Sequence, residues 1–397
     1  MRCNARSRIA SITRYGLTLA LFGCAGAPAL SPPAHAGGRV ATARIAATPA
    51  PVRVATTIVT PDAAFDVEEL FCSGQTALRQ GDYARAAQAF DRVIEQETAG
   101  IWLERALFQG ALAHEAQGDL DGAAQRFEQL GRRFPQAALA AEALLRSMRV
   151  QLHREAWPQA GEIARIYLER YPTSGPAGRI VAYAARGLEL LAADRQTEAE
   201  YFIAKGLQIV DQLELDRAGR IPRDLAQLYF ALGEARRQRA EQSRLSPDVK
   251  EFSARLERRC ELLLEAQSAY SDSMRAYDAH WSTMAGYRVG ELYERLHEEL
   301  MQIPPPHTGT ERERLLFEGA MRLRYSVLLN KAASMLEHTL AMAQRTGEQS
   351  EWVRRTEQSQ HQLEESRQAE ERALNQLPFS RAELERALDD LAARSRP

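Results

Sequence analysis

Cysteine is scarce in this sequence, and long apolar stretches are missing after the N-terminal region. The 397 residues include four cysteines and no Cys-x-x-Cys pair, which excludes a disulfide-rich scaffold and the common zinc and thioredoxin motifs. Two cysteines, Cys72 and Cys260, lie beyond the N-terminal region, and their apolar neighbours predict two small buried hydrophobic side chains. No later segment reaches the roughly 20 apolar residues that a membrane-spanning helix needs.

A dominant charge is also lacking. The 51 basic and 53 acidic residues give a formal net charge of −2, which provides no electrostatic basis for nucleic-acid binding. The GxSxG, P-loop, GxGxxG and HExxH signatures of common enzyme families do not occur. His297 is followed by two glutamates but not by the second histidine that a zinc site of this type requires. We therefore expect no catalytic residue, no metal site and no cofactor.

The first 36 residues have the pattern of an export signal. Four arginines precede an apolar stretch from Leu17 to about Leu30, and an Ala-His-Ala cleavage site ends at Ala36. This predicts a signal peptide at 1–36 and a periplasmic or secreted protein. Two alternatives stay open. Leu21 to Cys24 resembles a bacterial lipobox, in which Cys24 would be acylated and would anchor an outer-membrane lipoprotein; otherwise the N-terminus is apolar but uncleaved.

Residues 37–64 lack the apolar stripe of a helix. Glycine, alanine, proline, threonine and valine dominate there, and Pro49, Pro51 and Pro61 would interrupt a regular element. We predict a flexible linker between the signal region and the folded part of the chain.

An internal repeat with a period of 37 residues begins after residue 64. The segment from Gly81 to Phe90 returns as the segment from Gly118 to Phe127, and a further match follows at Trp157. One spacing shared by glycine, alanine and phenylalanine positions is not expected to arise by chance. The anchor positions of the repeat are Gly74, Gly81, Ala86, Phe90, Gly118, Ala123, Phe127, Pro135, Ala160 and Pro172.

The residue types at these positions predict pairs of antiparallel helices. Small residues allow two helices to cross closely, glycine suits the turn between them, and proline ends the second helix. A pair alone leaves an apolar face uncovered, so the pairs must stack into an all-α solenoid. We expect about four such units in 65–216. Residues 217–397 should form a region of degenerate repeats and long helices, in which 281–300 pairs with 312–345.

This pattern resembles the tetratricopeptide repeat (TPR). With its period of 37 residues and the run from Arg133 to Ala143, it is similar to the envelope TPR proteins of Gram-negative bacteria, including those of the barrel-assembly machine and the Tol–Pal system. The C-terminal half is loosely similar to TPR proteins of deltaproteobacterial envelope and gliding-motility complexes. The resemblance implies a non-enzymatic scaffold that binds other envelope proteins through the concave surface of the repeats and through its C-terminal helices. An accessory carrier module that serves a cell-wall enzyme or a secretion or motility complex is the alternative.

The resemblance also implies a partner-binding groove on the first helices of the units. Mixed charge at its positions argues against a clamp for an acidic C-terminal tail, and ordinary solvated helix positions are the alternative interpretation. The implied groove residues are Glu68, Gln75, Arg79, Arg105, Glu115, Arg149 and His153.

Overall fold

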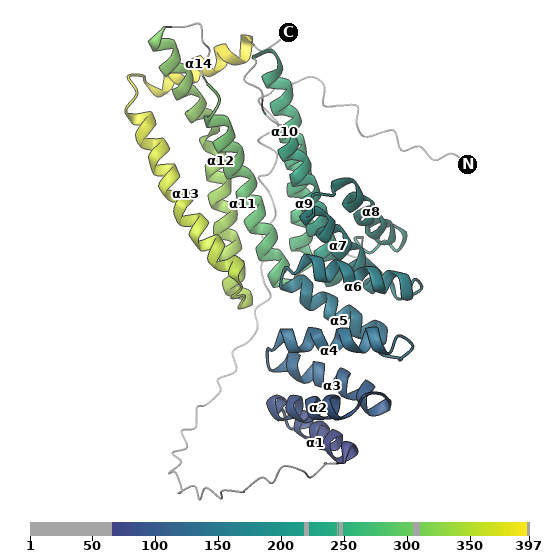
Figure 1. The fold of residues 1–397 in the computed structure, drawn as a ribbon. Coiled ribbons are helices and arrows are strands. Elements are labelled where there is room, and N and C mark those ends of the chain that lie inside the picture. The colour runs from purple at the N-terminus through teal and green to yellow at the C-terminus, as the bar shows by residue number, and fades with distance from the viewer. Residues whose placement is uncertain (1–65, 218–221, 244, 246–248, 305–309, 395–397) are drawn as a thin grey trace, which may run out of the picture. The chain divides into compact units, whose positions relative to one another are not determined.

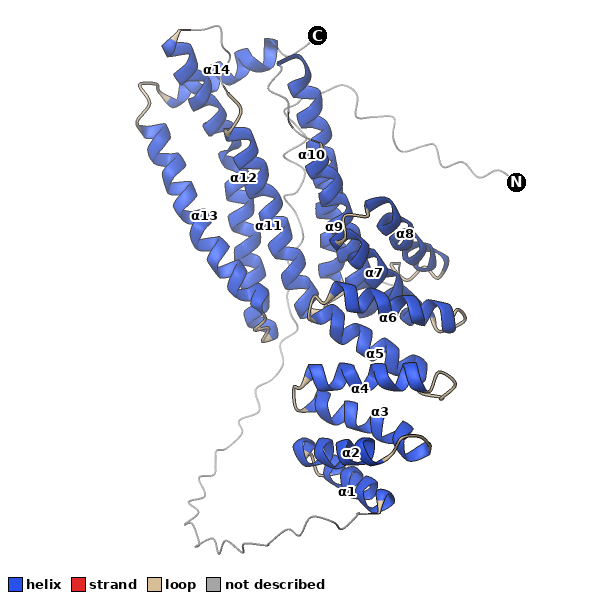
Figure 2. Ribbon diagram, in the orientation of Figure 1, coloured by secondary structure: helices blue, strands red, loops and turns tan. Residues whose placement is uncertain are grey.

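The computed structural model describes residues 66–217, 222–243, 245, 249–304 and 310–394. Over these ranges every regular element is a helix and no strand is present (Figures 1 and 2). The predicted signal peptide at 1–36, the linker at 37–64 and Cys24 lie outside the described residues and stay predictions. Among the helices that are described, none carries an apolar stretch long enough to cross a bilayer.

The first eight helices follow one another as pairs. Each packs against the helix before it and the helix after it. The second helices of the first three pairs begin at Tyr83, Leu120 and Trp157, which reproduces the spacing of 37 residues. The pairs are α1 (Val67–Arg79) with α2 (Tyr83–Gln96), α3 (Ile101–Ala116) with α4 (Leu120–Arg133), α5 (Ala140–His153) with α6 (Trp157–Arg170), and α7 (Pro176–Ala192) with α8 (Gln196–Gln212).

Longer helices follow after a short 3-10 turn. Helix α9 packs against α7 and α10, and α12 packs against α11, α13 and α14. The contact between α11 and α12 agrees with the pairing expected for 281–300 and 312–345. These elements are η1 (Arg223–Leu225), α9 (Ala226–Gln242), α10 (Val249–Arg275), α11 (Ala279–Met301), α12 (Glu311–Thr346), α13 (Glu351–Asn375) and α14 (Arg381–Arg394). The predicted all-α fold of paired helices with long C-terminal helices is confirmed.

The turns within the first two pairs share one construction. Gly81 and Gly118 adopt φ angles of 77° and 86°, a conformation that costs glycine little because it has no Cβ. Asp82 and Asp119 follow as N-caps, and their carboxylates accept hydrogen bonds from backbone N–H groups in the first turn of α2 and α4. The Gly-Asp pair therefore both reverses the chain and starts the second helix.

Small residues stand where the helices cross. Gly74 on α1 faces Phe90 on α2, and a Cβ at Gly74 would lie 2.9 Å from the ring. Gly290 on α11 faces Leu336 on α12 in the same way, at 2.6 Å from a methyl carbon. The close crossing expected from the repeat thus recurs among the long helices. The alanine and phenylalanine anchors Ala86, Phe90, Ala123, Phe127 and Ala160 are all fully buried.

The two proline anchors lie in the connections between pairs. Pro135 follows α4 and Pro172 follows α6, each one residue after the residue that caps the helix. Successive connections also contact each other, because the Tyr171 hydroxyl donates a hydrogen bond of 2.8 Å to the carbonyl oxygen of Pro135. These loops therefore link neighbouring units as well as ending their helices.

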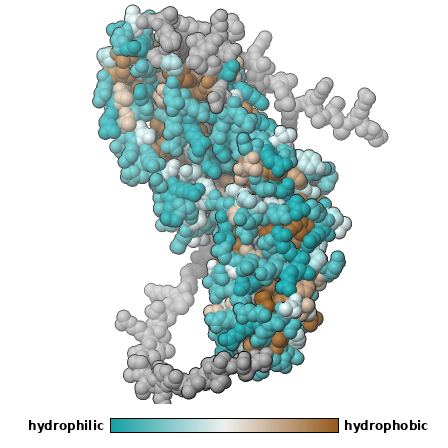
Figure 3. All heavy atoms as spheres, viewed as in Figure 1, coloured by the Kyte–Doolittle hydropathy of each residue, from teal (hydrophilic) through white to brown (hydrophobic). Residues whose placement is uncertain are grey.

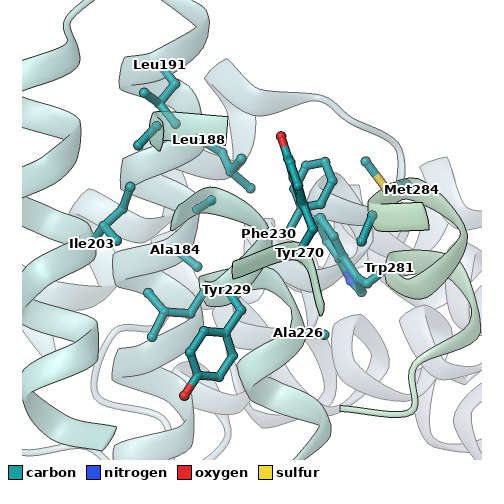
Figure 4. Packing of buried hydrophobic residues seen from close by; sticks show 14 of the residues in the cluster. Ala184, Leu188, Leu191, Ile203, Ala226, Tyr229, Phe230, Tyr270, Trp281 and Met284 are labelled. Carbon is teal, nitrogen blue, oxygen red and sulfur yellow. The ribbon is translucent and has the colours of Figure 1, made fainter. Parts of the chain in front are cut away.

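The apolar core is divided at the start of the array, one large cluster follows from α5 to the start of α13, and a smaller one lies between α12 and α13. Separate clusters surround Phe90 and Phe127, and the largest cluster extends from Leu144 on α5 to Trp352 on α13. Within it, the Phe230 ring lies 5.3 Å from Trp281 and 5.7 Å from Tyr270 between ring centres (Figure 4). Successive helix pairs thus share a core from α5 onward.

The prediction for one cysteine is wrong. Cys72 is exposed, whereas Cys260 is partly buried against the main cluster, and both are free thiols. The buried face of α1 contains Leu70, Phe71 and Gly74, and position 72 turns away from that face by the 100° per residue of a helix. Burial raises the pKa of the Cys260 thiol.

The close crossing between α11 and α12 predicts that Gly290→Ala lowers the stability of the fold. The added Cβ would overlap the Leu336 side chain, and overpacking of this kind costs about 1–3 kcal/mol, partly offset by about 1 kcal/mol of helix propensity. Urea unfolding of Gly290→Ala, Leu336→Ala and the double variant measures the coupling. We expect the double variant to lose less unfolding free energy than the sum of the losses in the two single variants. Strictly additive losses would contradict a direct contact between these two positions.

Candidate functional site

Five of the seven predicted groove residues lie on α1 and α3, the first helices of the first two pairs. Glu68, Arg79 and Arg105 are exposed, and Gln75 is half-buried. Arg79 donates a weak hydrogen bond of 3.4 Å to Thr76 on its own helix. The Arg105 guanidinium lies 6.0 Å from the centre of the Trp102 ring on its own helix. These side chains are thus held only by near neighbours and stay at the surface.

Glu115 of α3 and the two predicted groove residues on α5 have partners elsewhere in the fold. Glu115 accepts a hydrogen bond of 3.1 Å from Arg146 on α5. Arg149 donates one of 2.6 Å to Asp224 of η1, and the His153 ring lies 4.0 Å from the His280 ring of α11, between ring centres. The structure therefore does not bring the seven residues into one free surface. The positions on α5 are occupied by parts of the chain that follow the array.

The turn between α5 and α6 receives a second distant contact. Glu155 occupies the place that Gly81 and Gly118 hold in the earlier turns, and its φ angle is 58°. A residue with a Cβ pays about 1–2 kcal/mol for this left-handed conformation. The Glu155 carboxylate accepts a hydrogen bond of 2.6 Å from the indole nitrogen of Trp352, at the start of α13. The side chain that replaces glycine thus joins α13 to the array.

Aromatic residues complete this contact region. Trp157 and Trp281 lie 6.4 Å apart between ring centres, and Arg288 and Arg355 lie 5.3 and 4.6 Å from the ring of Trp352. Cation–π contacts of buried rings contribute on the order of 1–2 kcal/mol. We call this region the junction; it consists of His153, Glu155, Trp157, His280, Trp281 and Trp352.

A cavity of about 200 Å³ lies beside the junction, with Trp157, Phe230 and Arg288 among its lining residues. Glu234 of α9 also lines it and is buried. The Glu234 carboxylate accepts hydrogen bonds from Arg237 at 2.9 Å and from the Tyr270 hydroxyl at 2.6 Å, and it lies 3.0 Å from Nε of Arg288. The charges that border the cavity are therefore largely neutralised by one another.

The protonation states of this network are fixed by its geometry. Burial alone would raise the pKa of Glu234, but Arg288 and Arg237 outweigh it and hold the pKa below 4.5. Burial and the neighbouring Glu234 carboxylate raise the pKa of Tyr270 well above 10. Glu234 is thus ionised and Tyr270 neutral near pH 7. An arrangement of this kind stabilises ions and does not supply a general acid or base near neutrality.

A second polar cluster, which the sequence analysis missed, joins α2, α3 and α4. The buried His114 ring contacts Asp119 at 2.7 Å through Nδ1 and Asp91 at 3.1 Å through Nε2, and Arg126 donates to Asp91 at 2.6 Å. Gly122 makes room for it, since a Cβ there would lie 2.7 Å from Nδ1 of His114. Because carboxylates occupy both ring nitrogens, we interpret the cluster as a structural link between units.

Metal chemistry has no support in the part of the chain that the structure describes. There, no group of three or more His, Cys, Asp and Glu side chains is placed to hold a metal ion. The contact between Glu155 and Trp352, which are 197 residues apart in the sequence, is structural. The sequence offered one signal for it, because glycine is missing at residue 155 where the repeat places one.

The buried network predicts unequal effects of two charge-removing variants. Glu234→Gln leaves Arg237 and Arg288 without their buried carboxylate and should lower the free energy of unfolding by about 3–5 kcal/mol. Glu241→Gln, which removes a more exposed partner of Arg237 and Arg295, should cost about 1 kcal/mol or less. Chemical denaturation measures both. Equal losses in the two variants would contradict the central role of Glu234.

Comparison with known proteins supports the repeat assignment over part of the chain. The tetratricopeptide repeat family profile matches residues 105–137, which include most of α3 and all of α4. A solved tetratricopeptide repeat protein from Parabacteroides merdae is similar at 12% identity and a TM-score of 0.34, over 82% of this chain and 98% of that chain. This degree of likeness carries no argument about function. No curated protein matches the sequence. The chain therefore carries a tetratricopeptide repeat at residues 105–137.

Proposed function

We propose that the protein is a non-enzymatic scaffold of the bacterial cell envelope that binds partner polypeptides through α1 and α3. The observation that carries this proposal is the availability of Glu68, Gln75, Arg79 and Arg105 at the surface of the first two pairs. TPR proteins are generally protein–protein interaction scaffolds. Stacked helix pairs suit this role because they present an extended surface while each pair needs only its neighbours for stability.

The chemistry of this surface indicates a polar partner segment with charges of both signs. Glu68 can accept hydrogen bonds, whereas Arg79 and Arg105 can bind carboxylates through two parallel N–H groups. Hydrophilic residues also cover most of the described surface on the face drawn in Figure 3, with smaller hydrophobic areas between them. Arginine is enriched among the residues that dominate binding energy in interfaces, so we assign Arg79 and Arg105 the largest contributions.

The envelope location rests on the sequence of the first 36 residues. Their basic start, apolar centre and Ala-His-Ala site support export to the periplasm or beyond. The alternative is an outer-membrane lipoprotein acylated at Cys24, and in that case residues 37–64 would serve as the tether between the lipid and the helix pairs.

Site-specific photo-crosslinking in cells tests the binding surface. A photoreactive residue replaces Gln75 on α1 or Arg105 on α3, or, as matched controls, the exposed Gln88 or Arg92 on α2. We expect adducts of the same mass from positions 75 and 105, and none of that mass from α2, because only the first helices contact the partner.

A charge reversal at the same surface completes this experiment. Arg79→Glu introduced beside the photoreactive residue at 75 should reduce the adduct about tenfold or more, as expected for the loss of a charged contact worth 1.4 kcal/mol or more. Equal crosslinking from α2, or an adduct that the charge reversal leaves unchanged, would contradict binding through α1 and α3.

A further inference from the structure

We propose that the junction is a proton-sensitive latch: it holds the start of α11 and of α13 on the α5–α6 turn near neutral pH and releases them in mild acid. The inference goes beyond the proposed function and does not depend on it, because opening of the latch is a property of the chain alone. The observation that carries it is the stacking of two histidines from distant parts of the sequence.

The two histidine rings are close and unequally buried. His153 ends α5 and is exposed, whereas His280 begins α11 and is 6% exposed. Their ring centres lie 4.0 Å apart. Neither nitrogen of the His280 ring makes a hydrogen bond within the described residues. A neutral ring tolerates this environment, whereas a charged ring without a hydrogen-bond partner would be costly to keep there.

The charged groups around His280 come from each element that meets at the junction. His153 faces it from α5, Asp278 caps its own helix, and Glu348 lies in the connection between α12 and α13. The nearest carboxylate oxygen, Oε1 of Glu348, is 3.5 Å from Nδ1. The two carboxylates favour the charged ring, but burial and the neighbouring His153 oppose it more strongly.

The direction of the pH effect follows from this balance. Burial and then His153 lower the pKa of His280 below its ordinary value of 6.5. A ring whose pKa is lowered in the closed junction binds protons more readily once the junction has opened. The closed form therefore has its full stability above about pH 6.5 and loses stability as the pH falls below that value.

The contacts that would separate are few on α13, whereas the start of α11 is buried from His280 to Gly286. On α13, the buried side chains are Trp352, Thr356, Ser359 and Leu363 in a helix of 25 residues. Trp352 donates a hydrogen bond to Glu155, two residues after His153 in the sequence. Separation of the two rings therefore also weakens the hold on α13. Opening would leave His153 free on α5.

Tryptophan fluorescence of the full chain tests the latch. Three of the four tryptophans, Trp157, Trp281 and Trp352, belong to the junction, and Trp102→Phe removes the fourth. As the pH is lowered from about 8 to about 5, the range in which histidine titrates, we expect a reversible red shift with a midpoint below 6.5. Helix content, measured by circular dichroism, should stay constant through this transition.

Two variants of the histidine pair should abolish the red shift for different reasons. His280→Phe keeps an aromatic ring that cannot be charged. His153→Asp, at an exposed site that tolerates substitution, places a carboxylate beside the ring, so that protonation of His280 no longer opposes closure. A junction in which His153 had only a structural role would keep its acid transition in His153→Asp.

Two control variants test two other histidines. His361 is exposed on α13, and His361→Gln should behave like the wild type. His297 is buried at the other end of α11, where burial and Arg322 of α12 lower its pKa and Glu370 of α13 raises it; His297→Leu should also keep the transition. The proposal is overturned if the wild type shows no red shift, if the shift accompanies loss of helix, if either His280→Phe or His153→Asp retains it, or if His297→Leu removes it.

Discussion

Close crossing of helices at small residues is the constraint on which the rest of this structure depends. Phe90 fills the space against Gly74 of the same pair and against Gly110 of the next, so one side chain belongs to two units at once. The same arrangement joins later neighbours, with Gly206 against Leu228 and Gly290 against Leu336. A single pair cannot bury its apolar face, and stacking is therefore a condition of folding and not an addition to it.

The array changes character at the α5–α6 turn. In the first two pairs, the turn between the two helices contains glycine and makes its contacts within the pair. Glu155 in the third turn instead contacts Trp352, 197 residues further along the chain. The strained backbone at Glu155 is compensated by a contact that glycine could not make. Residues after the array consequently occupy the α5 positions, so the predicted groove residues without such distant partners lie on α1 and α3.

The repeat was predictable from the sequence because its signals are local. Gly81, Ala86 and Phe90 recur at a fixed spacing, and each has a physical role within one pair or between adjacent pairs. The junction was not predictable in the same way, because the positions of His280 and Trp352 relative to α5 depend on the packing of all helices between them. A missing glycine at residue 155 indicated that the third turn differs, but not which residue contacts it.

Hydrogen exchange of the full chain after Phe90→Ala tests most directly whether neighbouring pairs depend on a shared core. We predict that protection is lost together in α1, α2 and α3, since α1 and α3 both contact the Phe90 side chain of α2, and is kept in α11 and α12. Loss of protection confined to α2, with α1 and α3 unchanged, would contradict it.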